Sequence, residues 1–287
     1  MSAPPFGALA PSAREARYRA LAHRLPANYW GRRAASLLLG PAGGRTGAPK
    51  DVAVFGTQRA RLHPYDNICE KRVYATPQLW EPRERAALAA HITAAPGTDY
   101  VFVDVGANVG LYTLFARSAA AAAGKRLRAV CIEADPDMRA RLAFNLAASK
   151  ARDEACVLPF AVSRRREALR FAVNPRSRGT SRLSADGALD VQGEPLAAML
   201  LVHTAVRRVD AMKIDVEGGE FEALDGFFAA APQSLFPDLI IMEVAHDDGR
   251  ALQRCKAAGY AVRSRVRGNV VLQREASMPE SSGRSVD

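Results

Sequence analysis

The stretch YVFVDVGANVGLYTLFA, residues 100–116, has the pattern of a buried strand, a glycine-containing turn and an amphipathic helix. A loop that binds a dinucleotide pyrophosphate usually carries three glycines, as G-x-G-x-x-G. Here only Gly106 and Gly110 are present, and Asn108 takes the middle position. Asparagine tolerates a left-handed backbone and adds a hydrogen-bonding side chain. The stretch therefore predicts a ligand-binding turn that is not a typical dinucleotide site.

Strands and helices alternate on the carboxyl-terminal side of this stretch. We expect strands at about residues 101–105, 127–133, 155–160, 210–216 and 238–244, and helices at about 108–123, 136–149, 217–230 and 247–258. The strands are nearly continuous apolar runs, which favours a parallel sheet with helices on both faces. Within residues 160–200, AVS and LRFAV predict a hairpin around the turn RRRE, followed by a loop. A second, antiparallel hairpin at 260–274 is expected to close the α/β fold.

Composition limits the classes of protein that are possible. The 287 residues are 48% hydrophobic and carry a net charge of +10, but the arginines are scattered rather than gathered in one patch. No apolar run approaches the roughly 18 residues of a membrane span, there is no signal-peptide pattern, and the four cysteines form no CxxC pair. We expect a soluble, cytoplasmic protein with a partly flexible extension at 1–75, a main domain at 76–274 and a disordered tail at 275–287.

Two carboxylates at strand ends indicate which ligand the turn holds. Ligands of open parallel sheets bind beyond the carboxyl ends of the strands. Glu133 ends the second strand, where a carboxylate can accept both hydroxyls of a ribose. Asp104 ends the first strand, where it would repel a pyrophosphate and attract an ammonium group. A ribose without phosphate, next to an α-amino group and a sulfonium, is found in S-adenosylmethionine.

Several motifs resemble the FkbM family of S-adenosylmethionine-dependent methyltransferases. They are FVDVGANVGLYTLFA (102–116), IEADP (132–136), FAVS (160–163), MKIDVEGGEFEALDGF (212–227), PDLIIMEV (237–244) and GY…GNVVL (259–272), and the resemblance covers roughly residues 80–273. It implies a seven-stranded, class I methyltransferase fold and O-methylation of sugar or natural-product hydroxyls. The stretch before MKIDVEG is short and irregular, and the first ~75 residues match no family pattern. The expected cofactor-binding residues are Asp104, Gly106, Ala107, Asn108, Gly110, Glu133 and Ala161.

A lysine in the central strand predicts a cluster of charges. Lys213 and Asp215 lie on one face of the strand MKID, beside the strand ends that carry Asp104 and Glu243. A buried lysine is costly unless it is paired, so these groups are expected to meet. The cluster could only shape the cleft, could supply a general base, or could bind a metal ion through Asp215 and Glu243. Our candidate catalytic residues are Asp215, Glu217 and His246, and we expect no metal.

Three functions stay open at this point. The first is O-methylation of a small-molecule or glycan acceptor. The second is methylation of nucleic acid, which the net charge of +10 favours; against it, DVEG stands where amino-group methyltransferases carry an Asn/Asp-Pro-Pro-aromatic turn, and there is no Pro-Cys nucleophile. The third is a non-catalytic module that binds a partner through the arginine-rich N-terminus. Trp80 and Tyr74 are candidates to line the acceptor pocket, unless their rings only belong to the core. The oligomeric state is open.

Overall fold

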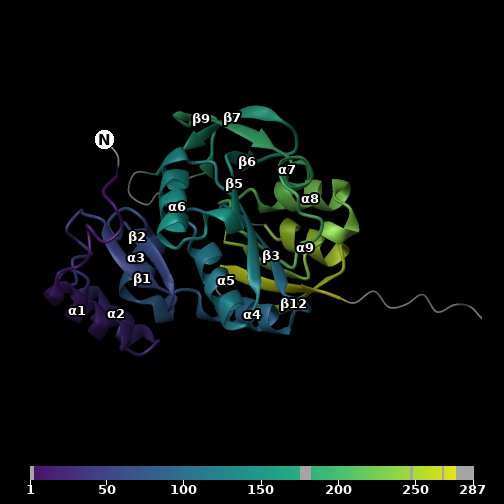
Figure 1. Cartoon of the computed structure of the whole chain (residues 1–287). Helices are drawn as coiled ribbons and strands as arrows, with labels where there is room; N and C mark the ends of the chain where they lie inside the picture. The colour runs from purple at the N-terminus through teal and green to yellow at the C-terminus, as the bar shows by residue number, and fades with distance from the viewer. Residues whose placement is uncertain (1–2, 175–181, 246–247, 267, 276–287) are drawn as a thin grey trace, which may run out of the picture.

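A seven-stranded sheet forms the centre of the protein (Figure 1). The computed structural model describes residues 3–174, 182–245, 248–266 and 268–275. The strand order is β12-β13-β11-β10-β3-β4-β5, in which only β13 runs antiparallel to its neighbours. The strands are β3 (Asp99–Val105), β4 (Arg126–Ile132), β5 (Ala155–Leu158), β10 (Ala211–Ile214), β11 (Leu239–Glu243), β12 (Tyr260–Val266) and β13 (Asn269–Arg274). The predicted mostly parallel sheet with a closing antiparallel hairpin is confirmed.

Helices cover both faces of this sheet because the central strands are apolar on both sides. Tyr100 and Phe102 of β3 face one apolar cluster, whereas Val103 and Val105 face a second one. The first face is covered by α4 (Pro82–Ala94), α5 (Leu111–Ala122) and α6 (Pro136–Ala148). The second is covered by α7 (Leu196–His203), α8 (Glu220–Ala230) and α9 (Arg250–Ala257). Short 3-10 turns, η2 (Arg152–Glu154) and η4 (Gln233–Leu235), precede β5 and β11.

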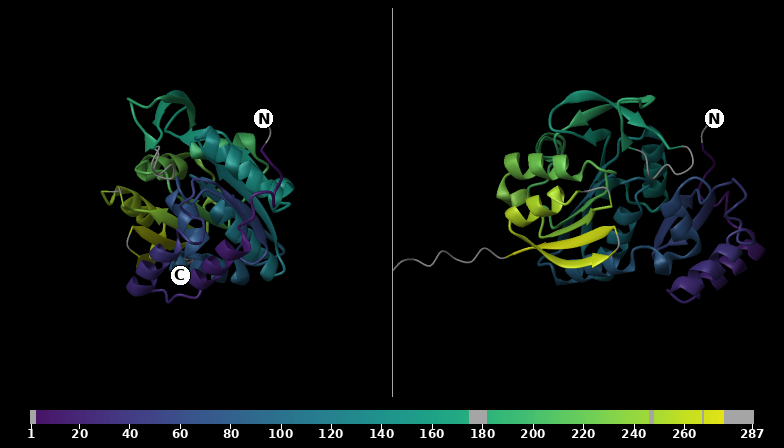
Figure 2. Two further views of the ribbon diagram at one scale, coloured as in Figure 1. Left: turned by 90° about the vertical axis from the view of Figure 1, so that its left-hand side faces the viewer. Right: turned by 180° about the vertical axis from the view of Figure 1, so that it is seen from behind.

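The N-terminal region packs against the first of these helical layers (Figure 2). Its elements are α1 (Ala13–His23), α2 (Tyr29–Leu38), the hairpin of β1 (Lys50–Val54) and β2 (Gln58–Leu62), α3 (Ile68–Ala75) and η1 (Pro77–Leu79). Val52, Leu62 and Tyr74 are buried in the same apolar cluster as Phe102 of β3. Most of the predicted tail, residues 276–287, lies outside the described residues.

The segment between β5 and β10 differs from the prediction. A small four-stranded sheet of order β6-β9-β7-β8 stands at one end of the molecule, and its strands are β6 (Phe160–Val162), β7 (Glu167–Ala172), β8 (Arg182–Leu183) and β9 (Leu189–Glu194). The predicted hairpin is wrong because β9 lies between β6 and β7 and pairs with both. The predicted loop is also wrong in part, since it contains β9 and the partly buried helix α7.

Three helices, α5, α8 and α9, begin three residues later than their apolar patterns predict; α9 begins at Arg250, after Gly249 with a φ angle of 96°. Asn108 and Gly110 have positive φ angles of 52° and 82°, so α5 begins at Leu111. Glu217 and Gly218 have φ angles of 55° and 106°, so α8 begins at Glu220. The left-handed conformation is incompatible with a right-handed helix. Strands β3 and β10 are therefore each followed by a short loop at the carboxyl edge of the sheet. Among the described helices, none has the length and apolarity to cross a bilayer.

Candidate functional site

A cavity of about 840 Å³ lies at the carboxyl edge of the seven-stranded sheet. The loops after β3, β4 and β10 and the end of β11 line one side of it, and β6 and β7 line another. This volume is within the range of small-molecule sites. Six of the seven predicted cofactor residues line it: Asp104, Gly106, Ala107, Asn108, Glu133 and Ala161. Lys213, Asp215, Glu217 and Glu243 line it as well.

The two glycines in the turn after β3 have different roles. A Cβ atom on Gly106 would lie 1.9 Å from the carbonyl oxygen of Asp215, so only glycine lets the turn pass the end of β10. The Gly106 N–H donates to the carbonyl of Ile132 at 2.9 Å, which ties the turn to β4. A Cβ on Gly110 would lie 2.3 Å from Cδ1 of Leu142 in α6. Gly110 is not among the residues that line the cavity, and its φ of 82° directly before α5 is a backbone conformation that favours glycine.

Glu133 is fixed at the end of β4 by backbone groups. The N–H of Asn108 donates to its Oε2 at 2.7 Å, and the N–H of Asp135 donates to its Oε1 at 2.8 Å. Burial raises the pKa of the Glu133 carboxyl to about 7, although these two hydrogen bonds oppose the rise. Each carboxylate oxygen has a second lone pair, so Glu133 can still accept two hydroxyl groups.

Asp104 is buried at the end of β3, with 2% of its surface exposed. Its Oδ2 accepts hydrogen bonds from the N–H and the hydroxyl of Thr113, at 3.1 and 2.7 Å. Burial raises the pKa of Asp104 to about 6, against the opposing effects of Thr113 and of the Lys213 charge. Asp104 is therefore mainly ionised at neutral pH, and it presents a negative charge to the cavity.

The predicted charge cluster forms around Lys213. Lys213 lies opposite Asp104 in the β10–β3 register, and its Nζ is 2.8 Å from Oδ2 of Asp215. Burial alone would lower the pKa of Lys213, but the charges of Asp215 and Glu81 outweigh burial and raise it. Burial and the neighbouring Asp215 raise the pKa of Glu243 to about 9. At neutral pH the cluster thus holds an ammonium group and a protonated Glu243 around the Asp215 carboxylate.

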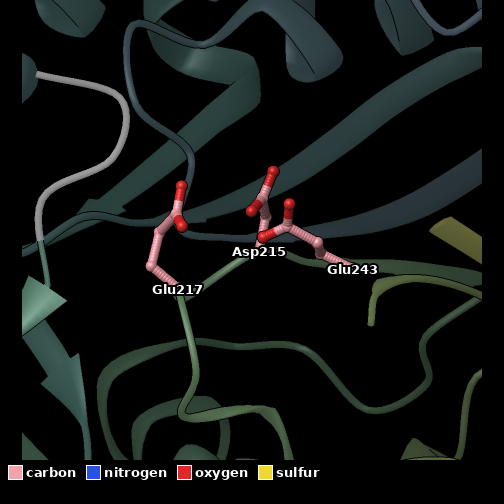
Figure 3. A group of neighbouring side chains, drawn as sticks. All are labelled: Asp215, Glu217 and Glu243. Atoms are coloured by element: carbon pink, nitrogen blue, oxygen red, sulfur yellow. The ribbon is translucent and has the colours of Figure 1, made fainter. Parts of the chain in front are cut away.

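Three of the carboxyl groups also have the geometry of a cation site. Ligand oxygens of Asp215, Glu217 and Glu243 all lie within 4.8 Å of one another, and Figure 3 shows the three side chains extending into the same space. The Lys213 ammonium next to Asp215 disfavours a divalent ion there. The third predicted catalytic residue, His246, lies outside the described residues.

Glu81 and Tyr112, which the sequence did not predict as site residues, also line the cavity. The Tyr112 hydroxyl donates to Oε2 of Glu81, and the Tyr112 ring centre is 5.2 Å from Nζ of Lys213. Glu81 adopts a left-handed conformation with φ 41°, directly before the Pro82 that begins α4. Left-handed non-glycine residues gather at functional sites. The Glu-Pro pair at a helix start was the only sequence signal for this residue.

The two aromatic candidates for the acceptor pocket behave differently. Tyr74 is fully buried, its hydroxyl donates to the carbonyl of Ala42, and it does not line the cavity. The prediction for Tyr74 is therefore wrong, because its ring packs the N-terminal region onto the core. Trp80 lines the cavity but is only 2% exposed, and its ring packs against Phe55 and Tyr112 at centroid distances of 5.6 and 5.1 Å.

The strand order and the cavity at the carboxyl edge define a class I methyltransferase fold. The family description "Methyltransferase FkbM domain" matches residues 104–262, which is more than half of the chain. The chain belongs to this family of methyltransferases. A comparison with curated proteins finds no match.

Several solved structures resemble the chain at low identity. A methyltransferase FkbM from Methylobacillus flagellatus KT is 15% identical, with a TM-score of 0.47 over 72% of this chain and 55% of the other. The chain thus spans just over half the length of that protein. A precorrin-6y methyltransferase from Geobacter metallireducens GS-15 is 16% identical, with a TM-score of 0.41 over 70% and 89%. The family assignment rests on the sequence match to residues 104–262.

Proposed function

We propose that this protein transfers a methyl group from S-adenosylmethionine to a hydroxyl group of a sugar, glycan or natural product. The observation that carries the proposal is Glu133, which two backbone N–H groups hold at the end of β4, at the wall of the large cavity. A carboxylate in this position suits the two hydroxyls of an unphosphorylated ribose.

The rest of the turn fits the same cofactor. At Gly106, which lines the cavity, the chain passes so close to the carbonyl of Asp215 that no side chain fits. Asp104 and Asp215 give this end of the cavity negative charge, which disfavours a pyrophosphate and favours the ammonium and sulfonium groups of S-adenosylmethionine. When bound, the cofactor supplies a methyl group already activated toward a nucleophile.

Asp215 and Glu217 are the candidates to accept the proton of the acceptor hydroxyl. Both line the cavity, whereas Glu243 is already protonated at neutral pH because its pKa is raised to about 9. The Lys213 ammonium, 2.8 Å from Oδ2 of Asp215, favours the ionised form of that carboxyl group. A positioned base typically raises the reaction rate about 10²–10⁴-fold. Alignment of the reacting groups lowers the activation barrier by about 7–11 kcal/mol in favourable cases. Alignment by the cavity walls is therefore the larger contribution.

The charges around the cavity favour a small acceptor over nucleic acid. The whole chain carries a net charge of +10, yet the described residues that line the cavity include nine carboxyl groups and four basic side chains. A polyanionic strand would be repelled from such a lining, because lysine and arginine supply the charge that neutralises phosphates and carboxylates oppose it. The nucleic-acid alternative thus has the net charge in its favour and the charge of the site against it.

The acceptor class can be tested with labelled S-adenosylmethionine. The protein is incubated with separate glycan, lipid, small-molecule and RNA fractions of the source cell, and the label in each is measured. We expect label in the glycan or small-molecule fraction, and less of it with Asp215→Asn. Glu167→Gln is a matched control, because Glu167 also lines the cavity but pairs with the exposed Arg165. Label in RNA alone would contradict the proposed acceptor class. A folded protein that binds the cofactor but labels no fraction would support the non-catalytic alternative.

A further inference from the structure

A second cavity, of about 380 Å³, lies where the N-terminal region meets the start of α4. Its walls come from α1, the β1–β2 turn, α3, η1 and α4. All of these elements precede residue 104, so they lie outside the family match. Arg19, His23 and Arg85 line this cavity, and among its described lining residues there is no carboxyl group.

The two arginines bind backbone carbonyl groups. Arg19 donates from Nε to the carbonyl of Tyr74 at 2.9 Å and from Nη2 to that of Ala53 at 3.2 Å. Arg85 donates from Nε to the carbonyl of Trp80 and from Nη2 to that of Pro77, both at 2.7 Å. A guanidinium group has five N–H donors. Each arginine therefore keeps donors beyond those that these carbonyls use.

Among the residues that the structure describes, no acid contacts either guanidinium group directly. Within the described part of the chain, no salt bridge joins Arg19 or Arg85 to a carboxylate, although Glu81 and Glu84 act on Arg85 from a distance. Burial lowers the pKa of both arginines, as expected for partly desolvated cations. Two half-buried positive charges on one small cavity are stabilised if an anion occupies it.

Gln78 also lines this cavity, and its amide oxygen is unsatisfied by any described residue. Its Nε2 donates to the carbonyls of Ala22 and Leu25 at 3.0 and 3.1 Å, which fixes the orientation of the amide. Its Oε1 is buried and, among the described residues, has no hydrogen-bond partner. A buried amide oxygen without a partner costs free energy, so a ligand with an O–H group would satisfy it.

We propose that this second cavity binds a small oxyanion that also carries a hydroxyl group, as hydrogen phosphate and phosphate monoesters in their monoanionic form do. Arg19 and Arg85 supply charged donors to the anionic oxygens, and Gln78 accepts from the hydroxyl. The simpler alternative is that Arg19 and His23 only cap α3, since both contact the carbonyl of Tyr74 near its C-terminal end. That alternative leaves the Gln78 oxygen without an explanation, whereas Arg85 also packs over the rings of Phe55, Trp80 and Phe115. The proposal does not depend on the methyltransferase activity.

Calorimetry with inorganic phosphate at pH 7 tests the site, with sulfate as a probe that has no proton. We expect one phosphate per chain and weaker binding of sulfate. Arg19→Gln should weaken phosphate binding by at least about tenfold, because charge-assisted hydrogen bonds are lost. Arg17→Gln is the matched control, since it removes the same charge from an exposed position of α1 and should leave the affinity unchanged.

Arg85→Gln gives a second variant in case Arg19→Gln does not fold. Saturable phosphate binding that either variant weakens, and Arg17→Gln does not, supports the proposal. Two results would overturn it: no saturable binding up to about 10 mM phosphate, or an equal loss with Arg17→Gln. The second result would mean that phosphate responds only to the net charge of the protein.

Discussion

The pKa of Glu133 predicts how cofactor affinity depends on pH. Burial raises this pKa to about 7, and only the ionised carboxylate can accept both ribose hydroxyls. At pH 8 about nine tenths of Glu133 is ionised, and at pH 6 about one tenth. Cofactor affinity should therefore rise with pH and level off above about pH 8, with an overall change of about tenfold between pH 6 and pH 8.

S-adenosylhomocysteine is the suitable ligand for this measurement, because it lacks the sulfonium charge and is not consumed. Its dissociation constant is measured by calorimetry at several pH values for the wild type, Glu133→Gln and Glu133→Ala. The glutamine variant cannot titrate, so its affinity should change much less between pH 6 and pH 8. Glu133→Ala should weaken binding by about 1.5–3 kcal/mol, as for hydrogen bonds to a charged group, while the fold is retained.

Asp104 and Glu243 also titrate near the cavity, with pKa values raised to about 6 and about 9. The glutamine variant separates their contribution, since it changes neither residue. If wild type and Glu133→Gln show the same pH profile, Glu133 does not bind the ribose. Unchanged affinity in Glu133→Ala would lead to the same conclusion.

Three further predictions test other parts of the site. Gly106→Val should abolish cofactor binding, because its Cβ would lie 1.9 Å from the Asp215 carbonyl at a φ of +76°; wild-type affinity measured by calorimetry would show that the ligand binds elsewhere. Methyl transfer should survive EDTA, because the Lys213 ammonium already pairs with Asp215; activity that EDTA stops and magnesium restores would support a metal at Asp215, Glu217 and Glu243. Trp80→Ala should lower the melting temperature by several degrees, since truncating a buried tryptophan costs about 3–5 kcal/mol; an unchanged melting temperature with a raised KM for the acceptor would instead make Trp80 a pocket residue.

The sheet was predictable because its strands are long apolar runs bounded by glycine and charge. The same pattern placed Asp104, Glu133 and Glu243 at strand ends, and the buried lysine in MKID predicted the contact between Lys213 and Asp215. These inferences depend on the alternation of side chains between the two faces of a strand and on the geometry of parallel strands. The cavity-lining positions of the first turn followed from them.

Other features depend on contacts between distant residues. The hydrophobic pattern does not show that β9 lies between β6 and β7, because LDVQGE mixes apolar and polar residues and contains a glycine. The position of Glu81 depends on the left-handed turn before Pro82 and on the hydroxyl of Tyr112. Helix starts were misplaced where left-handed residues, Asn108 and Glu217, interrupt an apolar pattern.

A crystal structure of the protein with S-adenosylhomocysteine would test the central proposal most directly. We predict that the ligand occupies the cavity of about 840 Å³, with both ribose hydroxyls within hydrogen-bonding distance of the Glu133 carboxylate and the amino group near Asp104 or Asp215. A nucleoside bound elsewhere, or no binding of S-adenosylhomocysteine to folded protein, would contradict the proposed cofactor site.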